Sequence, residues 1–422
     1  MTKLADEDGP PLGEIGDPLA ALAERPLSRL AAPVYLPAAV YAVGNGAVTP
    51  MIAITAHDLG ASLTLAGLIA GLPLIGRLLG DAPSGSLVGR VGERAAMLWA
   101  SAFTLLATVA VLAVQTLVVL SVAGLVMGVA SSTFMLARHA LITDNVPARF
   151  RGRALAMLAG MVRTGMAVGP FLTAALIGWT GALAAYWIQM VTTVAVMAFL
   201  MRVPDVAGGA SRHAMHESHN TVQMLARNAD VFLKLGIGIG TLMMLRMARP
   251  IIVPLWGLAI DLDPTTIAIA MGVSGALEVA LFYVGGYLTD RFGRTWVAVP
   301  VTAGMAVGTA GLALAHGVVA FFVVTAVIAL ANSLGGGIMM TMGSDLAVGR
   351  GKTSQFLGVW RLFSDGATAL APFIISAATA LAGPALAAGA LGVVGGVGAG
   401  MLWRWMPAYF GAELDAELSN TL

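Results

Sequence analysis

Gly286-Tyr-Leu-Thr-Asp-Arg-Phe-Gly-Arg294 has the pattern G-x-L-x-D-R-x-G-R. The pattern recurs 201 residues earlier in Gly85-Ser-Leu-Val-Gly-Arg-Val-Gly-Glu-Arg94, where Gly89 takes the place of the Asp. Each copy follows one long apolar run and precedes another. A chain that repeats the same hairpin at half its length is predicted to be a duplicated helical bundle, and in membranes such duplications place a site between their halves.

The composition indicates a membrane protein. The chain has 422 residues, of which 58% are hydrophobic and 11% charged, whereas a soluble domain carries about 25% charged residues. A formal net charge of +1 and the lack of a basic block give no indication of a nucleic-acid partner, and the absence of Cys excludes disulfides. Residues 1–30 are polar and acidic and lack the features of a signal peptide, so we expect a cytoplasmic tail.

A membrane helix needs about 20 mainly apolar residues. The sequence predicts twelve such helices, at residues 32–56, 62–88, 95–115, 116–140, 152–178, 181–203, 229–259, 265–289, 295–315, 317–343, 353–381 and 385–407. The predicted fold is an all-α membrane protein with twelve transmembrane helices in two pseudo-symmetric six-helix bundles. The expected parts are a tail at 1–30, a bundle at 31–203, a central cytoplasmic loop at 204–228, a bundle at 229–407 and a tail at 408–422.

The positions of the basic residues predict the orientation. Of the 23 Lys and Arg residues, 18 fall in the tails and in the loops of one side, with Arg138 counted there because it ends the fourth predicted helix. Basic loops face the cytoplasm, so we expect both termini to be cytoplasmic and the protein to lie in the cell membrane (inner or plasma). The other five lie inside predicted helices: Arg77, Arg163, Arg246, Arg249 and Arg361.

The repeated loop resembles the signature of the major facilitator superfamily. The residues that carry the resemblance are Gly85, Arg90, Gly286, Asp290, Arg291, Gly293 and Arg294. Gly165-Met-Ala-Val-Gly169-Pro170 in the fifth predicted helix resembles the G-x-x-x-G-P motif of the drug:proton antiporter (efflux) group. The sequence departs from that group at Gly89, after Pro170, and in the fourth helix, whose middle carries no Arg. The resemblance implies a transporter that works by alternating access.

Asp290 gives the loop a physical interpretation. It ends the eighth predicted helix, near the expected start of the fifth, where a carboxylate can accept hydrogen bonds from free amides. Arg291 and Arg294 can hold acids or lipid headgroups, so the loop is predicted to be a latch that closes the cytoplasmic side. The alternative is a tight turn whose arginines extend to the membrane surface.

Three acids, Asp81, Glu278 and Asp365, accompany the five arginines in the predicted helices. Each charge at the bilayer centre costs about 2.5–3.5 kcal/mol, so we expect pairing or exposure to a cavity. The offset of 201 residues makes Arg77 and Glu278 equivalent.

The resemblance implies that helices 2 and 11 meet, and helices 5 and 8. Two pairs follow, Arg77 with Asp365 and Arg163 with Glu278, while Asp81 would pair with Arg77 or with Arg361. They would be either static braces between the halves or proton carriers.

Arg246 and Arg249 are three residues apart and therefore share one helix face. They are the expected unmatched charges, and an unpaired Arg in a cavity favours an anion. Asp81 or carbonyls freed at Pro250 could match them instead. The resemblance implies that helices 1, 4, 7 and 10 line a watery pocket between the bundles, which gives the further cavity candidates Tyr41, Asn45, Phe134, Met135, Met243, Asn332 and Met339.

The predicted function is secondary active transport, most simply proton-coupled export of small amphipathic molecules. The alternatives are uptake or exchange of an organic anion, and a receptor or scaffold that transports nothing. The expected partners are a small-molecule substrate, protons and the lipid bilayer, with the protein a monomer. No catalytic motif is present, so neither an enzyme nor a cofactor is predicted, and His213, His216 and His219 are interpreted as part of a polar linker rather than a metal site.

Overall fold

A computed structural model describes residues 34–202, 221–348, 350 and 353–421. The predicted tail at 1–30 lies outside the described residues, as do His213, His216 and His219 of the central loop. The first half contains α2 (Leu36–Asp58), α3 (Leu63–Val91), α4 (Glu93–Ala113), α5 (Leu117–Asn145), α6 (Ala148–Thr180), η2 (Gly181–Leu183) and α7 (Ala184–Arg202).

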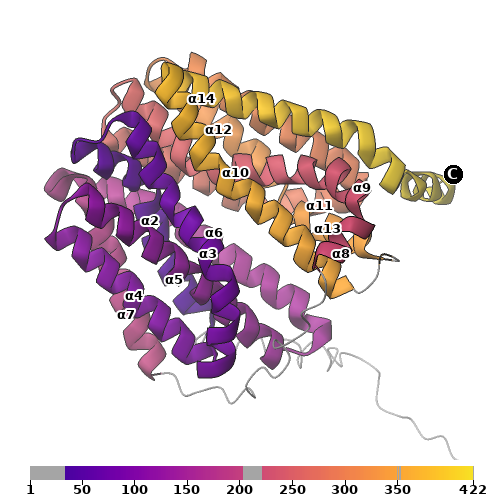
Figure 1. Ribbon diagram of the computed structural model, residues 1–422, viewed down its shortest axis with the longest axis horizontal. Coiled ribbons are helices and arrows are strands. Elements are labelled where there is room, and N and C mark those ends of the chain that lie inside the picture. Colours follow the sequence, from indigo (N-terminus) through magenta and orange to yellow (C-terminus); the bar gives the residue numbers. More distant parts are fainter. Residues whose placement is uncertain (1–33, 203–220, 349, 351–352, 422) are drawn as a thin grey trace, which may run out of the picture.

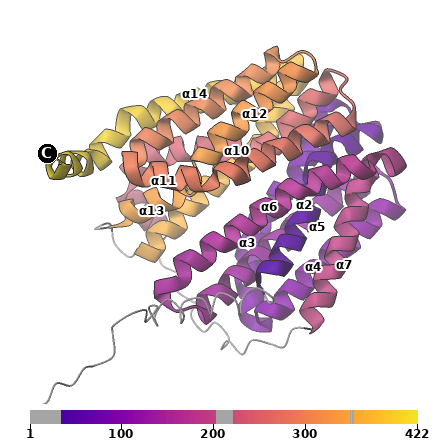
Figure 2. The same cartoon turned by 180° about the vertical axis from the view of Figure 1, so that it is seen from behind.

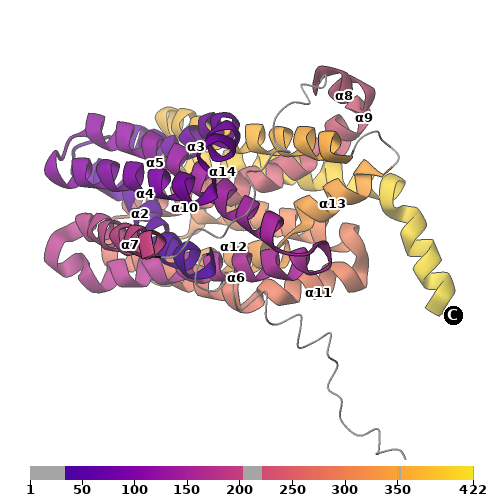
Figure 3. The ribbon, with the colours of Figure 1, turned by 90° about the horizontal axis from the view of Figure 1, so that it is seen from below.

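The second half is helical as well. It contains α8 (Thr221–Arg227), α9 (Ala229–Val231), the π-helical η3 (Phe232–Gly236), α10 (Ile237–Ala259), α11 (Pro264–Gly311), η4 (Leu312–Leu314), α12 (Val318–Leu334), α13 (Ile338–Ala347) and α14 (Thr353–Thr421). Figures 1 and 2 show the helices of each half grouped together, with the two groups side by side. Figure 3 shows α8, α9 and the last turns of α14 at one end of the molecule, here named the terminal end.

The two longest helices, α11 and α14, each fold back on themselves. Gly293 in α11 has φ 79° and Gly383 in α14 has φ 81°, a region of backbone conformation that glycine adopts without steric cost. On either side of Gly383, Ala367 and Gly398 contact consecutive residues of α10, Gly240 and Thr241. Two points so far apart in α14 can reach the same level of α10 only if the chain reverses at Gly383.

In the part of the chain that the structure describes, ten helical segments are long and apolar enough to cross a membrane, judged by length and composition. Two of them, Arg149–Arg202 and Gln355–Phe410, have 54 and 56 residues, more than twice the length that one crossing needs. Large apolar side chains such as Trp179, Leu314 and Trp403 are strongly exposed, which suits contact with lipid. The chain is therefore an all-helical integral membrane protein.

The backbone repeats with the predicted offset. Adding 201 to the bounds of α2 gives Ile237–Ala259, which are the bounds of α10. Gly92, between α3 and α4, has φ 82° and ψ 163°, and its equivalent Gly293 has φ 79° and ψ 167°. The α2 and α10 spans are also the two most enclosed of the ten.

The halves touch at the end opposite the terminal end. Near the start of α3, Gly71 lies against Pro372 of α14, and near the start of α11, Gly272 lies against the ring of Phe171 from α6. These are the helix pairs that the resemblance implied. Figure 2 shows the two groups of helices diverging towards the end where α13 lies.

Candidate functional site

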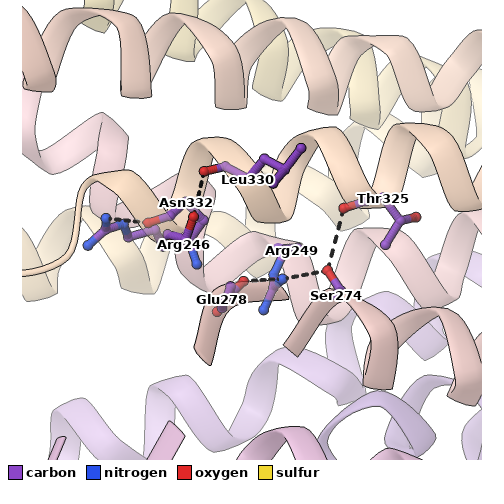
Figure 4. Close-up of polar contacts among 8 residues, drawn as sticks. Arg246, Arg249, Ser274, Glu278, Thr325, Leu330 and Asn332 are labelled. Atoms are coloured by element: carbon purple, nitrogen blue, oxygen red, sulfur yellow. Dashed lines mark hydrogen bonds and ion pairs between the residues drawn. The ribbon is translucent and has the colours of Figure 1, made fainter. Parts of the chain in front are cut away.

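Arginines of α10 and a glutamate of α11 form a charged cluster in the middle of the second half (Figure 4). Glu278 is halfway between Pro264 and the break at Gly293, so it lies near mid-depth. Arg246 and Arg249 are one turn apart on α10, immediately before the turn that contains Pro250. We name Arg246, Arg249, Ser274, Glu278 and Asn332 the α10–α11 cluster.

Within this cluster, Arg249 and Glu278 form an ion pair in which both side chains are nearly buried. The contact brings the two charges together without the geometry of a directed hydrogen bond at Glu278 Oε1. Arg249 also donates a hydrogen bond to Ser274 Oγ (2.9 Å), which lies 3.4 Å from the carbonyl of Thr325. Glu278 is therefore held by a cation of its own half.

Arg163 of α6 faces this cluster from the other half. Its guanidinium lies 4.5 Å from the centre of the Phe282 ring, a cation–π contact between α6 and α11. It is within electrostatic range of Glu278 and Arg249. The predicted ion pair between Arg163 and Glu278 is wrong, because Arg249 on the neighbouring helix reaches the carboxylate and Arg163 stacks on the ring one turn away.

Arg246 binds the main chain beside a break in the tenth predicted helix. Its Nη2 donates to the carbonyl of Asn332 (3.0 Å), in the last turn of α12. The turn at residues 335–337 separates α12 from α13, with Gly337 at φ 86°. A Cβ at Gly335 would lie 2.6 Å from Arg246 Nη2, so glycine there leaves room for the guanidinium. The sequence predicts an unbroken helix at 317–343, although the run of three glycines was a signal for the break.

The first half holds a second cluster, between α3 and α5. Arg77 Nη2 lies 3.0 Å from the sulfur of Met135, and Ser132 donates a short hydrogen bond to Asp81. Arg138 is 9% exposed and lies within electrostatic range of Arg77. The assignment of Arg138 to the end of its helix is wrong, because α5 continues to Asn145, two residues before Pro147. That proline was the signal that could have placed Arg138 inside the helix.

The predicted ion pair between Arg77 and Asp365 is also wrong, because Asp365 pairs with a different arginine. Asp365 lies 3.6 Å from Arg361, one turn away on α14, and both side chains are partly exposed. Asp81 and Asp365 nevertheless lie within electrostatic range of Arg77. Charged residues of both halves therefore lie near Arg77. Among the described residues, none of them forms a direct ion pair with a residue of the other half.

The predicted cavity residues separate into two groups. Tyr41 and Phe134 are buried and stacked, with ring centres 4.1 Å apart, and the Tyr41 hydroxyl lies 2.9 Å from Thr104 Oγ1. They form part of the first half's core instead of an open wall. Asn45, Met135, Met243 and Met339 are partly exposed, and Asn332 is buried beside Arg246.

The described residues of the predicted latch form hydrogen bonds or ion pairs with residues of their own half. Arg94 donates to the carbonyl of Leu200 (2.7 Å) in α7, and Arg294 Nε lies 2.9 Å from Asp345 Oδ2 in α13. Arg291 donates to the hydroxyl of Tyr287. Further members Gly85 and Gly286 are partly exposed, Arg90 is exposed, Gly293 forms the break in α11, and the side chain of Asp290 lies outside the described residues.

The glycines of the antiporter-like motif pack α6 against α2. Gly165 lies against the carbonyl of Ala39, and Gly169 lies against the backbone of Val43 and Ala47. Small residues allow membrane helices to approach this closely. Pro170 follows within α6. No group of three or more His, Cys, Asp or Glu residues in the described part of the chain could hold a metal ion.

Comparisons with known proteins agree with this architecture. Residues 34–245, half of the chain, match the model of the Major Facilitator Superfamily. A POT family transporter, crystallised with a thioalcohol-conjugated peptide, has a similar structure with TM-score 0.72 and 11% identity, over 91% of this chain and 96% of that one.

Two further structures are similar at low identity. The xylose transporter XylE from E. coli, in an inward open conformation, has TM-score 0.66 and 17% identity, and a D-xylose-proton symporter has 0.65 and 16%; each covers 88% of this chain and 96% of the other. No curated protein matches the sequence. Together with the repeated backbone, the match over half of the sequence shows that the chain belongs to the Major Facilitator Superfamily.

Proposed function

We propose that the chain is a proton-coupled secondary transporter that moves a small amphipathic molecule across a cell membrane by alternating access. The observation that carries the proposal is Glu278, a carboxylate at mid-depth that pairs with Arg249 and lies within electrostatic range of Arg163 on the other half. Protonation of Glu278 would remove one charge of the pair. The two halves would then hold each other differently, which couples proton binding to their movement.

The helix count and orientation are part of the same proposal. Each of the 54- and 56-residue spans contains a glycine with positive φ, Gly181 or Gly383. With one crossing on each side of these glycines, the ten spans become the twelve expected from the sequence. The basic loops then place the terminal end in the cytoplasm, so the separated ends of the two halves face inwards.

Two transport directions have separate support. Export in exchange for protons is supported by the resemblance of Gly165–Pro170 to the antiporter motif, although close packing of α2 and α6 serves either direction. Uptake of an organic anion is supported by Arg163 and Arg246, which form no ion pair among the described residues, and by the structural likeness to a proton symporter. In vesicles that contain the protein, substrate and protons would move in opposite directions in the first case and together in the second.

The movement can be tested without a substrate, because the chain contains no Cys. Spin labels on Val91→Cys and Phe292→Cys would report the separation of the halves at the terminal end, and labels on Val114→Cys and Leu314→Cys would report it at the other end. All four positions are exposed. Double electron–electron resonance on the full chain in lipid measures both distances.

We expect Glu278→Gln, which removes the negative charge of the pair, to change the two distances in opposite senses relative to the parent chain. Asp144→Asn, an exposed acid at the end of α5, is the matched control and should behave as the parent chain. Distances that are the same in Glu278→Gln and in the parent chain would contradict the proposal.

A further inference from the structure

The positive charge around the α10–α11 cluster exceeds the negative charge. Arg246, Arg249 and Arg163 lie within electrostatic range of one another and of Glu278. Glu278 compensates Arg249, so among the described residues two guanidiniums remain without an acidic partner. At mid-depth each uncompensated charge costs about 2.5–3.5 kcal/mol, which exceeds the about 2 kcal/mol that a cation–π contact such as that of Arg163 recovers when desolvated.

Polar atoms of the cluster also lack partners. Nε of Arg246 and Oδ1 of Asn332 are buried without a hydrogen bond, although Arg246 Nη2 binds the main chain of Asn332. Buried polar groups in native proteins are almost always bonded. The unsatisfied Nε of Arg246 is a donor, and together with the charge excess it indicates that a group from outside the chain completes the site.

We propose that the substrate carries one or two acidic groups, carboxylate, sulfonate or phosphate, which bind Arg246 from the second half and Arg163 from the first. The inference rests on the proposed function and specifies the substrate of its site. A planar guanidinium binds such anions through two parallel hydrogen bonds. Because the two arginines belong to different halves, an anion between them would hold the halves together. Phe282 and the partly exposed Met243 supply apolar surface for the rest of an amphipathic acid.

The same geometry sets the sign of the coupling. An anion near Glu278 adds a second negative charge beside that carboxylate, and like charges favour the protonated form. The charged groups that face Glu278 are Arg249 and Arg246 of α10 and Arg163 of α6. Anion and proton should therefore bind together, which favours uptake of an acid with a proton over exchange.

Binding to the purified full-length protein at pH 7 tests this inference with probes of one shape: benzoate, benzenesulfonate, phthalate, benzyl alcohol and benzylammonium. We expect the anions to bind, the dianion phthalate most tightly because the excess charge is two, and the alcohol and the ammonium to bind at least tenfold more weakly. Arg246→Gln and Arg163→Gln should each weaken anion binding about 10- to 100-fold, the effect of removing a charge-assisted hydrogen bond. Glu278→Gln, which imitates the protonated carboxyl, should bind phthalate more tightly than the parent chain.

Arg404→Gln is the matched control, because Arg404 is exposed on α14 and stacks on Trp405, away from the cluster. The unfolding temperature of each variant without probe identifies any that fail to fold, and Arg246→Lys, which keeps the charge, should bind with intermediate affinity. The inference is overturned if the anions bind no more tightly than the alcohol, or if no probe binds at all. It is also overturned if Arg246→Gln and Arg163→Gln both bind the anions as tightly as the parent chain. The distance measurements need no ligand, so they can support transport while this inference fails.

Discussion

The two halves share a backbone but not its charges. α2 and α10 have equivalent bounds, yet Asn45 in α2 corresponds to Arg246 in α10, and Val48 to Arg249. At mid-depth the sign itself changes, since Arg77 of α3 occupies the position of Glu278. The duplicated backbone therefore provides the scaffold, and the departures from symmetry mark the residues that bind charge.

A second difference concerns the backbone itself. In the first half α5 is continuous from Leu117 to Asn145, whereas its counterpart is divided into α12 and α13 around residues 335–337. Arg246 binds the last turn of α12 at this break. The asymmetry in charge and the asymmetry in backbone thus meet at one residue of the candidate site.

The largest expected effect breaks the ion pair that only the second half has. Arg249→Leu leaves Glu278 buried beside an apolar side chain, and removing one partner of a buried pair costs about 3–5 kcal/mol of unfolding free energy. The double variant Arg249→Leu with Glu278→Leu should recover most of that loss, because neither charge is then left unpaired. Chemical unfolding of the purified protein measures both.

The equivalent position in the first half is the control. Val48→Leu leaves no buried charge unpaired and adds only one methylene to a buried position, so it should cost about 1–3 kcal/mol, the range for overpacking. If Arg249→Leu were equally mild, the ion pair would contribute nothing to stability, and the contrast between the halves at this level would disappear.

The next effect tests the close packing of α6 on α2 at Gly169, whose equivalent position in the second half is a leucine. Gly169 touches the backbone of Val43 and Ala47, so a methyl group at this position must push two helices apart. Gly169→Ala should cost about 1–3 kcal/mol, the range for overpacking. Its equivalent, Leu370, is 56% exposed, and Leu370→Ala should change stability by less than about 0.5 kcal/mol. Equal losses at both positions would contradict the assignment of the motif to helix packing.

The sequence predicts the repeat well because the repeat depends on apolar length and on a fixed offset, whereas the helix contacts between the halves were implied by the resemblance. Gly92 and Gly293 illustrate this, since the same residue adopts the same φ and ψ in both halves. The partners of charged residues were predicted less well. Depth along a helix follows from sequence position, but a partner depends on helix rotation and side-chain reach.

Glu278 shows this limit. It lies at the predicted depth beside α6, as expected, yet Arg249 of the neighbouring helix reaches it before Arg163 does. Arg138 shows a different limit, because a few residues of error at a helix end moved a buried charge into a loop.

A smaller effect tests the break in the second half. Gly337 has φ 86°, and a left-handed conformation costs other residues about 1–2 kcal/mol. Gly337→Ala should lower stability by that amount. Gly92 of the first half has a similar φ but ψ 163°, a region essentially restricted to glycine, so Gly92→Ala should cost at least as much. Thermal unfolding compares them. A neutral Gly337→Ala would mean that α12 and α13 join into one helix, like α5, with little strain.

The smallest effect concerns Arg294 and Asp345, which tie α11 to the short α13. Their equivalents in the first half, Glu93 and Asp144, are both acidic and cannot form such a pair. Both partners in the second half are 29% exposed, so Asp345→Asn should cost no more than about 1 kcal/mol, and less at high salt, because exposed pairs are screened. Asp144→Asn should leave stability unchanged. A cost for Asp345→Asn that persisted in 1 M salt would show that this pair is screened from solvent as the pair of Arg249 and Glu278 is, and that the second half depends on its charges at the terminal end as well as at mid-depth.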